Sequence, residues 1–244
     1  MSDELVQNNQ MVLISGESGT GKSASLRNIR NKNKWLYENC EAGKQLPFKN
    51  DFITKIITEP LDVPDHFDEA TENPDFIDGI IIDTITFLME RFESVHVLPS
   101  ANTQKAWGNY NQFFKTIMQE KVPLFGKPVL ILGHTKAEIL DDGSRVSAVP
   151  VKGALRGAGV EAYFSTVVSA KTMPLKELVK YENDLLNITE EDEILGYKHV
   201  FQTRKTKATV GERIRSPMGL FTIEQTFIDN DAQLLLDHMN RYYN

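Results

Sequence analysis

The stretch Gly16-Glu17-Ser18-Gly19-Thr20-Gly21-Lys22-Ser23 constrains this chain more than any other part of its sequence. It fits G-x-x-x-x-G-K-[ST], the P-loop, whose backbone N–H groups surround the phosphates of a nucleotide. An apolar run at residues 11–14 precedes it, and residues 24–31 have a helical pattern. A helix N-terminus at this place attracts anions, so the context fits the motif. The sequence therefore predicts a nucleotide-binding site.

Two side chains of the motif are predicted to meet the nucleotide directly. Lys22 is expected to reach the β- and γ-phosphates, and the Ser23 hydroxyl to bind Mg²⁺. The residues predicted to bind the cofactor are Gly16, Glu17, Ser18, Gly19, Thr20, Gly21, Lys22, Ser23 and Ala24.

Apolar runs alternate with helical patterns along the chain, which is typical of βαβ units and a parallel sheet. Strands are predicted at residues 11–14, 35–41, 52–58, 80–83, 128–134, 164–169 and 199–203, and helices at 61–71, 84–95 and 104–121. Residues 219–226 alternate like an antiparallel edge strand. Asp229 is predicted to cap a last helix, with an apolar stripe at Leu234, Leu235, Met239 and Tyr242.

Length and composition favour one α/β domain over residues 1–244. A chain of 244 residues with 41% hydrophobic content can bury a full core. It contains no apolar run of about 18 residues, so no membrane span is expected. The N-terminus lacks the pattern of a secretory signal, and the single cysteine, Cys40, fits a reducing compartment. We therefore expect a cytoplasmic protein.

The charge is unevenly distributed. The net charge of −7 argues against a non-specific polyanion binder. Residues 59–93 include eleven acidic side chains and one basic one, whereas residues 198–215 include six basic side chains and one acidic one. This asymmetry predicts an acidic outer surface and a basic working face; ordinary solvated surface charge is the alternative.

Further candidates for the chemistry follow three predicted strands. Asp83 ends the apolar run at residues 80–83, which is predicted to be a central strand; it could hold Mg²⁺ directly or through water, or cap the next helix. Glu41 could orient the attacking water, with Glu38 and Glu59 as rivals and a surface role as the alternative. His134 ends another buried strand and is expected to sense the γ-phosphate, or else to be structural.

Together these segments resemble the RecA-like ATPases, in particular compact phage-encoded members linked to single-strand annealing and recombination. If the chain is phage-encoded, the expected compartment is the cytoplasm of a bacterial host. Residues 36–41 resemble the strand that ends in the family's catalytic glutamate, which maps to Glu41. Ile82-Asp83-Thr84 resembles the Walker B acid, and His134 lies where the family has a polar γ-phosphate sensor. The resemblance implies a RecA-like core, with a mostly parallel twisted sheet between helices and an antiparallel edge near the C-terminus.

The resemblance also implies contacts with DNA and with a neighbouring protomer. Residues 141–159, with Arg145, Lys152 and Arg156, correspond to a mobile DNA-contacting loop. Arg204-Lys205-Thr206-Lys207 resembles the family's Lys-x-Lys segment, whose lysines reach a neighbour's γ-phosphate. Lys205 and Lys207 fit best, with Arg204 as an alternate. The alternative to this functional interpretation is an exposed basic turn without a role in the reaction.

The resemblance therefore predicts an ATPase that binds ATP and Mg²⁺, is stimulated by single-stranded DNA, and forms a ring or short filament. Catalytic roles are expected for Lys22, Glu41, Asp83, His134, Lys205 and Lys207. Only ten residues precede the first predicted strand, so we expect an ATPase core without a polymerisation segment or an appended C-terminal domain. Two alternatives are a regulatory or assembly ATPase acting on a protein partner, and a nucleotide-binding module with little turnover.

Overall fold

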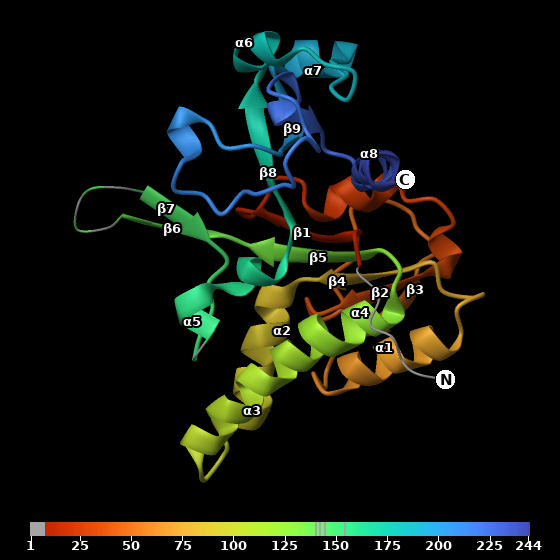
Figure 1. Ribbon diagram of the computed structural model, residues 1–244, viewed down its shortest axis with the longest axis vertical. Helices are drawn as coiled ribbons and strands as arrows, with labels where there is room; N and C mark the ends of the chain where they lie inside the picture. The colour runs from red at the N-terminus through yellow and green to blue at the C-terminus, as the bar shows by residue number, and fades with distance from the viewer. Residues whose placement is uncertain (1–7, 140, 142, 144, 154) are drawn as a thin grey trace.

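The computed structural model describes residues 8–139, 141, 143, 145–153 and 155–244 (Figure 1). Most of the N-terminal segment, residues 1–7, and residues 142, 144 and 154 of the predicted DNA-contacting loop lie outside the described residues. Within the described part of the chain, no helix combines the length and the apolar character needed to cross a bilayer.

An eight-stranded sheet with the order β10-β9-β8-β1-β5-β4-β2-β3 organises the chain. Its strands are β1 (Met11–Gly16), β2 (Trp35–Asn39), β3 (Ile53–Ile56), β4 (Gly79–Asp83), β5 (Val129–His134), β8 (Thr166–Pro174), β9 (Tyr197–Gln202) and β10 (Phe227–Asp229). Strands β3, β2, β4, β5, β1 and β8 pair in parallel, whereas β9 and β10 pair antiparallel. The predicted mostly parallel sheet with an antiparallel C-terminal edge is confirmed.

Helices cover both faces of this sheet (Figure 1). One face packs on α1 (Asp62–Glu72), α2 (Ile85–Phe92), α3 (Thr103–Thr116) and α4 (Val122–Phe125). The other face packs on the short 3-10 helix Ser23–Asn28 and on α8 (Ala232–Tyr243). Strands β1 and β4 are buried along their whole length, because a central parallel strand is covered from both sides.

Two predicted helices, one after the P-loop and one at the C-terminus, are wrong in detail. The helix expected at residues 24–31 is a 3-10 helix that ends at Asn28, because Ile29 turns to an extended ψ of 127°. The last helix is capped by Asp231, not Asp229; the Asp231 carboxylate accepts hydrogen bonds from the backbone N of Gln233 and of Leu234. Its buried stripe is accordingly Ala232, Leu235, Leu236 and Met239, and Tyr242 is exposed.

The antiparallel edge strand lies later in the chain than residues 219–226. Residues Glu224–Thr226 form a 3-10 turn, and β10 follows it. The Thr222 hydroxyl accepts from Gln225 N at 3.3 Å, and Gln225 Oε1 accepts from Thr222 N at 3.1 Å. These side-chain bonds to the backbone replace the ladder bonds that a strand would need.

The predicted DNA-contacting loop contains regular structure. Strands β6 (Lys136–Ile139) and β7 (Arg145–Ala148) form an antiparallel hairpin, and the short helix α5 (Leu155–Ala158) follows. Figure 1 shows this hairpin extending away from the main sheet. Two further short helices, α6 (Leu175–Leu178) and α7 (Glu190–Leu195), lie between β8 and β9.

Candidate functional site

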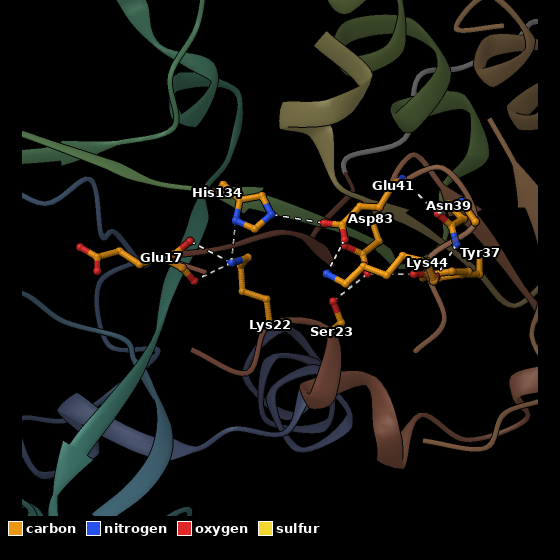
Figure 2. Close-up of polar contacts among 11 residues, drawn as sticks. Glu17, Lys22, Ser23, Tyr37, Asn39, Glu41, Lys44, Asp83 and His134 are labelled. Atoms are coloured by element: carbon orange, nitrogen blue, oxygen red, sulfur yellow. Dashed lines mark hydrogen bonds and ion pairs between the residues drawn. The ribbon is translucent and has the colours of Figure 1, made fainter. Parts of the chain in front are cut away.

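The P-loop and the ends of three parallel strands meet at one edge of the sheet (Figure 2). Strand β1 runs into the P-loop, and Asp83 and His134 end β4 and β5. Glu41 follows β2 by two residues. The carboxyl ends of parallel strands share one edge, so the topology brings together residues far apart in the sequence.

Glycines let the P-loop take its path. A Cβ atom at Gly16 would lie 2.7 Å from the carbonyl oxygen of Ala170 on β8, too close for any other residue. Gly21 has a φ of +92°, a conformation that side chains with a Cβ rarely adopt. The path of the loop therefore requires glycine at both positions.

Lys22 is buried within the loop, with 5% of its surface exposed. Its Nζ donates to the carbonyl oxygens of Gly16 at 2.9 Å and Glu17 at 2.8 Å, and lies 3.2 Å from Nδ1 of His134. Burial lowers the pKa of Lys22 to about 8, although the nearby carboxylates of Asp83 and Glu41 oppose this shift. The ammonium is thus placed among acceptors at the centre of the site.

Asp83 receives two hydroxyl groups on a single oxygen. Ser23 Oγ and Tyr37 Oη each donate to Oδ2 at 2.9 Å. The other oxygen, Oδ1, is buried and has no hydrogen-bond partner among the described residues. Burial raises the pKa of Asp83, and the two donated bonds oppose that rise. A buried carboxylate oxygen without a partner, beside a P-loop serine, fits the oxygen ligands that Mg²⁺ prefers.

Glu41 and His134 form a second pair at this edge. Nε2 of His134 lies 3.2 Å from Oε1 of Glu41, and Lys44 Nζ donates to Oε2 at 2.7 Å. The hydrogen bond from His134 is the main reason that the pKa of Glu41 falls to about 2. Because Nε2 faces a carboxylate and Nδ1 faces the Lys22 ammonium, the partners select the tautomer protonated on Nε2.

The ring of His134 is fixed from its own strand and from α2. Its backbone N donates to the Thr86 hydroxyl at 2.9 Å. The ring packs edge-to-face on Phe87, with centroids 5.6 Å apart. His134 therefore holds a defined position between Lys22 and Glu41. The sequence contains no signal that Thr86 and Phe87 would position it.

The two rival glutamates lie elsewhere. Side chains alternate along β2, so Glu38 points to the face of the sheet that packs on α1, opposite to the face of Tyr37. Glu38 Oε1 lies 3.0 Å from Nδ1 of His66 on α1. It is fully buried, and burial raises its pKa to about 7. Glu59 Oε1 lies 2.6 Å from Nε2 of His96. Of the three candidates, Glu41 is the one that lines the cavity beside the P-loop.

That cavity has a volume of about 700 Å³, large enough for a nucleotide. The predicted residues that line it are Ser18, Gly19, Gly21, Lys22, Ser23, Ala24, Glu41, Asp83 and His134, whereas Gly16, Glu17 and Thr20 line a separate cavity. It is also lined by Arg27, Tyr197, His199 and Asn230, for which the sequence contains no signal. His199 and Asn230 pack close to Gly21, since a Cβ there would lie 3.4 Å and 3.2 Å from their side chains. The C-terminal strands therefore close the side of the site opposite β2.

The basic segment after β9 lies apart from this cavity. Lys205 and Lys207 are exposed, and neither belongs to the described residues that line the P-loop cavity. Lys205 Nζ donates to the Val210 carbonyl at 3.2 Å, and Arg204 donates to the Phe221 carbonyl at 2.8 Å. Within one chain, the structure does not bring these lysines to the P-loop.

The three predicted DNA-contacting residues are exposed on and after the hairpin. Arg145 lies 3.4 Å from the Glu17 carboxylate of the P-loop, and Lys152 pairs with Glu93. Arg156 lies on α5. The hairpin is thus adjacent to the phosphate-binding loop, a contact that the sequence could not indicate.

Among known proteins, similarity to this chain is found in solved structures. No protein-family model matches the chain, and no curated protein matches it. Among solved structures, it is similar to a KaiC-like protein from the hyperthermophilic archaeon Pyrococcus horikoshii OT3. The sequence identity is 13%, the TM-score is 0.46, and the match covers 86% of each chain.

Proposed function

We propose that this chain is a Mg²⁺-dependent ATPase with a RecA-like core that acts on single-stranded DNA, in phage-type recombination or annealing. One observation carries the ATPase part: Lys22, Ser23, Asp83, Glu41 and His134 converge at one sheet edge, around a cavity of about 700 Å³. The backbone loop, the buried cation and the carboxylates are the parts that phosphoryl transfer to water requires.

The protein groups divide into phosphate-binding, metal-binding and water-positioning sets. Ser23 and Asp83 would hold Mg²⁺, since Oδ1 of Asp83 is buried without a partner among the described residues. A bound Mg²⁺ neutralises charge on the phosphate oxygens. Lys22 already sits among acceptors that phosphate oxygens can replace, so a nucleotide gives its ammonium stronger, charge-assisted partners.

Glu41 is suited to orienting water rather than to taking its proton outright. With a pKa of about 2 it stays ionised throughout the neutral range, and its two oxygens accept from His134 and Lys44. A carboxylate held in this way offers its remaining lone pairs to water but is a weak base. His134 lies between Glu41 and Lys22, so it can report a change at the phosphates to the attacking side.

The DNA part of the proposal depends on Arg145, Lys152 and Arg156. Arg145 is exposed on the hairpin, Lys152 on the segment that follows it and Arg156 on α5. Exposed cations are what a protein needs to follow the phosphate backbone of a single strand. Arg145 also touches the P-loop through Glu17. The affinity should fall with salt, with a log–log slope of about −0.7 for each phosphate neutralised.

The test measures ATP hydrolysis with Mg²⁺, with and without single-stranded oligonucleotide, for the wild type and Lys22→Ala. We expect DNA-stimulated turnover in the wild type and at least a hundredfold loss in the variant, since the γ-phosphate loses its nearest cation. Equal turnover in both proteins would remove the site assignment. Turnover that ignores DNA, together with no oligonucleotide binding at low salt, would remove the DNA assignment.

A second candidate is a regulatory or assembly ATPase that acts on a protein. The acidic stretch at residues 59–93 and the sequence pI of about 5.3 favour it. Part of that charge is neutralised internally, because Asp68 pairs with Lys121 and Glu93 with Lys152. Turnover without any DNA binding would support this candidate, and a chain that binds ATP without turnover would be a nucleotide-binding module.

A further inference from the structure

A second cavity, of about 480 Å³, lies beneath the hairpin and shares no lining residue with the P-loop cavity in the described part of the chain. Side chains from four segments line it. They include Trp107 on α3, Lys136 on β6, Lys152 and Arg156 around α5, and Arg213 after β9. We call these five residues and the space between them the hairpin cavity.

The hairpin cavity concentrates positive charge on an acidic protein. Four of its lining side chains are cations, whereas the net charge of the chain is −7. Two carboxylates also line it, Glu138 and Glu161. Glu161 is 3% exposed and accepts from Val149 N at 2.7 Å, so it is directed at the backbone. Lys152 is paired with Glu93, and Glu138 is exposed. The excess of positive charge that a polyanion would meet therefore comes from Lys136, Arg156 and Arg213.

Trp107 supplies an aromatic ring to this basic cavity. The other tryptophan, Trp35, is buried at 4% exposure, whereas Trp107 is half-buried and lines the cavity. Its ring packs edge-to-face on Tyr110, with centroids 5.2 Å apart. Gly153, with a φ of +61°, presses against it, since a Cβ there would lie 3.1 Å from Cε3 of Trp107. These contacts hold the indole in one orientation.

A backbone hydrogen bond links the two segments that carry Lys136 and Arg213. Ser147 N on β7 donates to the Gly211 carbonyl at 3.1 Å, which joins the hairpin to the segment that carries Arg213. A Cβ at Gly211 would lie 1.9 Å from the Arg145 carbonyl oxygen, so this close approach requires glycine. Lys136 and Arg213 are therefore presented from two segments at a fixed separation.

We propose that the hairpin cavity binds one unstacked base of single-stranded DNA against Trp107, with the flanking phosphates on Lys136 and Arg213. A rigid aromatic ring among cations is how proteins bind single strands with little sequence preference. A base paired in a duplex has both faces stacked, so a single strand fits the cavity and a duplex does not. This inference rests on the proposed DNA-binding function and extends it to three residues outside the segment at 141–159.

The test uses a labelled oligothymidylate, the full-length protein and two readouts, fluorescence anisotropy and intrinsic tryptophan fluorescence. On binding we expect quenching of the tryptophan signal in the wild type and none in Trp107→Phe, in which the buried Trp35 is the remaining tryptophan. Lys136→Gln and Arg213→Gln, both at exposed positions, should each weaken binding about fivefold to tenfold and lower the salt slope. Lys176→Gln, an exposed charge on α6, is the matched control and should bind like the wild type.

The outcomes separate this inference from the proposed function. Quenching that depends on Trp107, together with weaker binding in both glutamine variants, supports the hairpin cavity. Oligonucleotide binding without quenching, with Arg213→Gln equal to Lys176→Gln, overturns the cavity and leaves the DNA function standing. A competing duplex that displaces the oligonucleotide at equal concentration also overturns it. No binding of any oligonucleotide at low salt overturns both proposals.

Discussion

Nε2 of His134 lies 3.2 Å from Oε1 of Glu41, although the two residues are 93 positions apart in the sequence. The histidine also lies 3.2 Å from the Lys22 ammonium through its other nitrogen. A phosphate-binding cation and a water-positioning carboxylate are thereby joined through one imidazole ring.

Glu41→Gln is expected to bind ATP with unchanged affinity but to lose turnover by about a hundredfold or more. The amide cannot offer two anionic oxygens to water, whereas the phosphate-binding groups are untouched. Glu59→Gln is the control, because Glu59 pairs with His96 and does not line the P-loop cavity. Single-turnover hydrolysis distinguishes the two, and an unchanged rate in Glu41→Gln would assign the water to another group.

Asp83→Asn is expected to remove the dependence of ATP binding on Mg²⁺. The buried Oδ1 loses the negative charge that fits a divalent cation. Tyr37→Phe deletes a hydrogen bond to Oδ2 but leaves the carboxylate in place, so it should keep the dependence. Titrations of ATP with Mg²⁺ and with EDTA measure the effect; a normal Mg²⁺ requirement in Asp83→Asn would place the metal elsewhere.

ATP binding should take up protons near pH 8. Burial holds the pKa of free Lys22 at about 8, and a bound phosphate raises it again. At pH 8 roughly half a proton should be taken up per ATP, and affinity should fall as pH rises further. Calorimetry in buffers of different ionisation enthalpy measures this uptake. Lys22→Arg stays charged and should show none; uptake that persists in the arginine variant would belong to another group.

The free energy of unfolding should depend on the Glu38–His66 pair between about pH 4.5 and 7. The folded pKa of Glu38, about 7, exceeds the unfolded value of 4.5, so the folded state holds the extra proton in this window. Stability from this group is therefore complete below pH 4.5 and is lost as pH rises. The hydrogen bond with Glu38 also raises the pKa of His66, which extends the loss upward.

Glu38→Gln should flatten this profile by on the order of 3 kcal/mol between those limits. Urea unfolding of both proteins at several pH values gives the difference. Parallel profiles for the wild type and Glu38→Gln would show that Glu38 titrates normally.

Lys205 and Lys207 are expected to act on a neighbouring protomer. They are exposed and do not line the described P-loop cavity of their own chain. A mixture of Lys22→Ala protomers with Lys205→Ala/Lys207→Ala protomers should recover part of the ATPase activity, since some interfaces combine an intact P-loop with intact lysines. Groups that reach a phosphate in this way are worth about 10³-fold or more. Simple addition of the two residual activities at every ratio would contradict the prediction.

Most of the residues at the sheet edge could be predicted, because the strands that carry them can be recognised in the sequence. Apolar runs that end in Asp83 and His134 identify parallel strands, and parallel strands end together. Alternation along β2 also separates Glu38 from Tyr37, but the sequence does not say which face meets the nucleotide. Tyr37, Lys44 and Thr86 acquire their roles through contacts between distant segments, for which a single sequence contains no local signal.

The misplaced edge strand has a local cause. Residues 219–226 alternate apolar and polar as a strand does, but Thr222 and Gln225 bond to each other's backbone and form a turn. Strand β10 begins two residues after Gln225 and pairs with β9 at Phe227–Gln202. Polar side chains that can replace backbone partners make alternation an ambiguous pattern.

The position of β1 in the sheet pairs it with two strands that lie far along the chain. Its two neighbours are β5 and β8, with Met11 opposite Val129 and Val12 opposite Thr166. Both partners follow β1 in the chain, so β1 leaves the ribosome before them and lacks a complete set of neighbours until β8 has been synthesised. Pairings of such long sequence separation form slowly, because closing the loops costs entropy before contacts compensate. The nucleotide loop that β1 carries is thus synthesised well before the two strands that hold β1 in place.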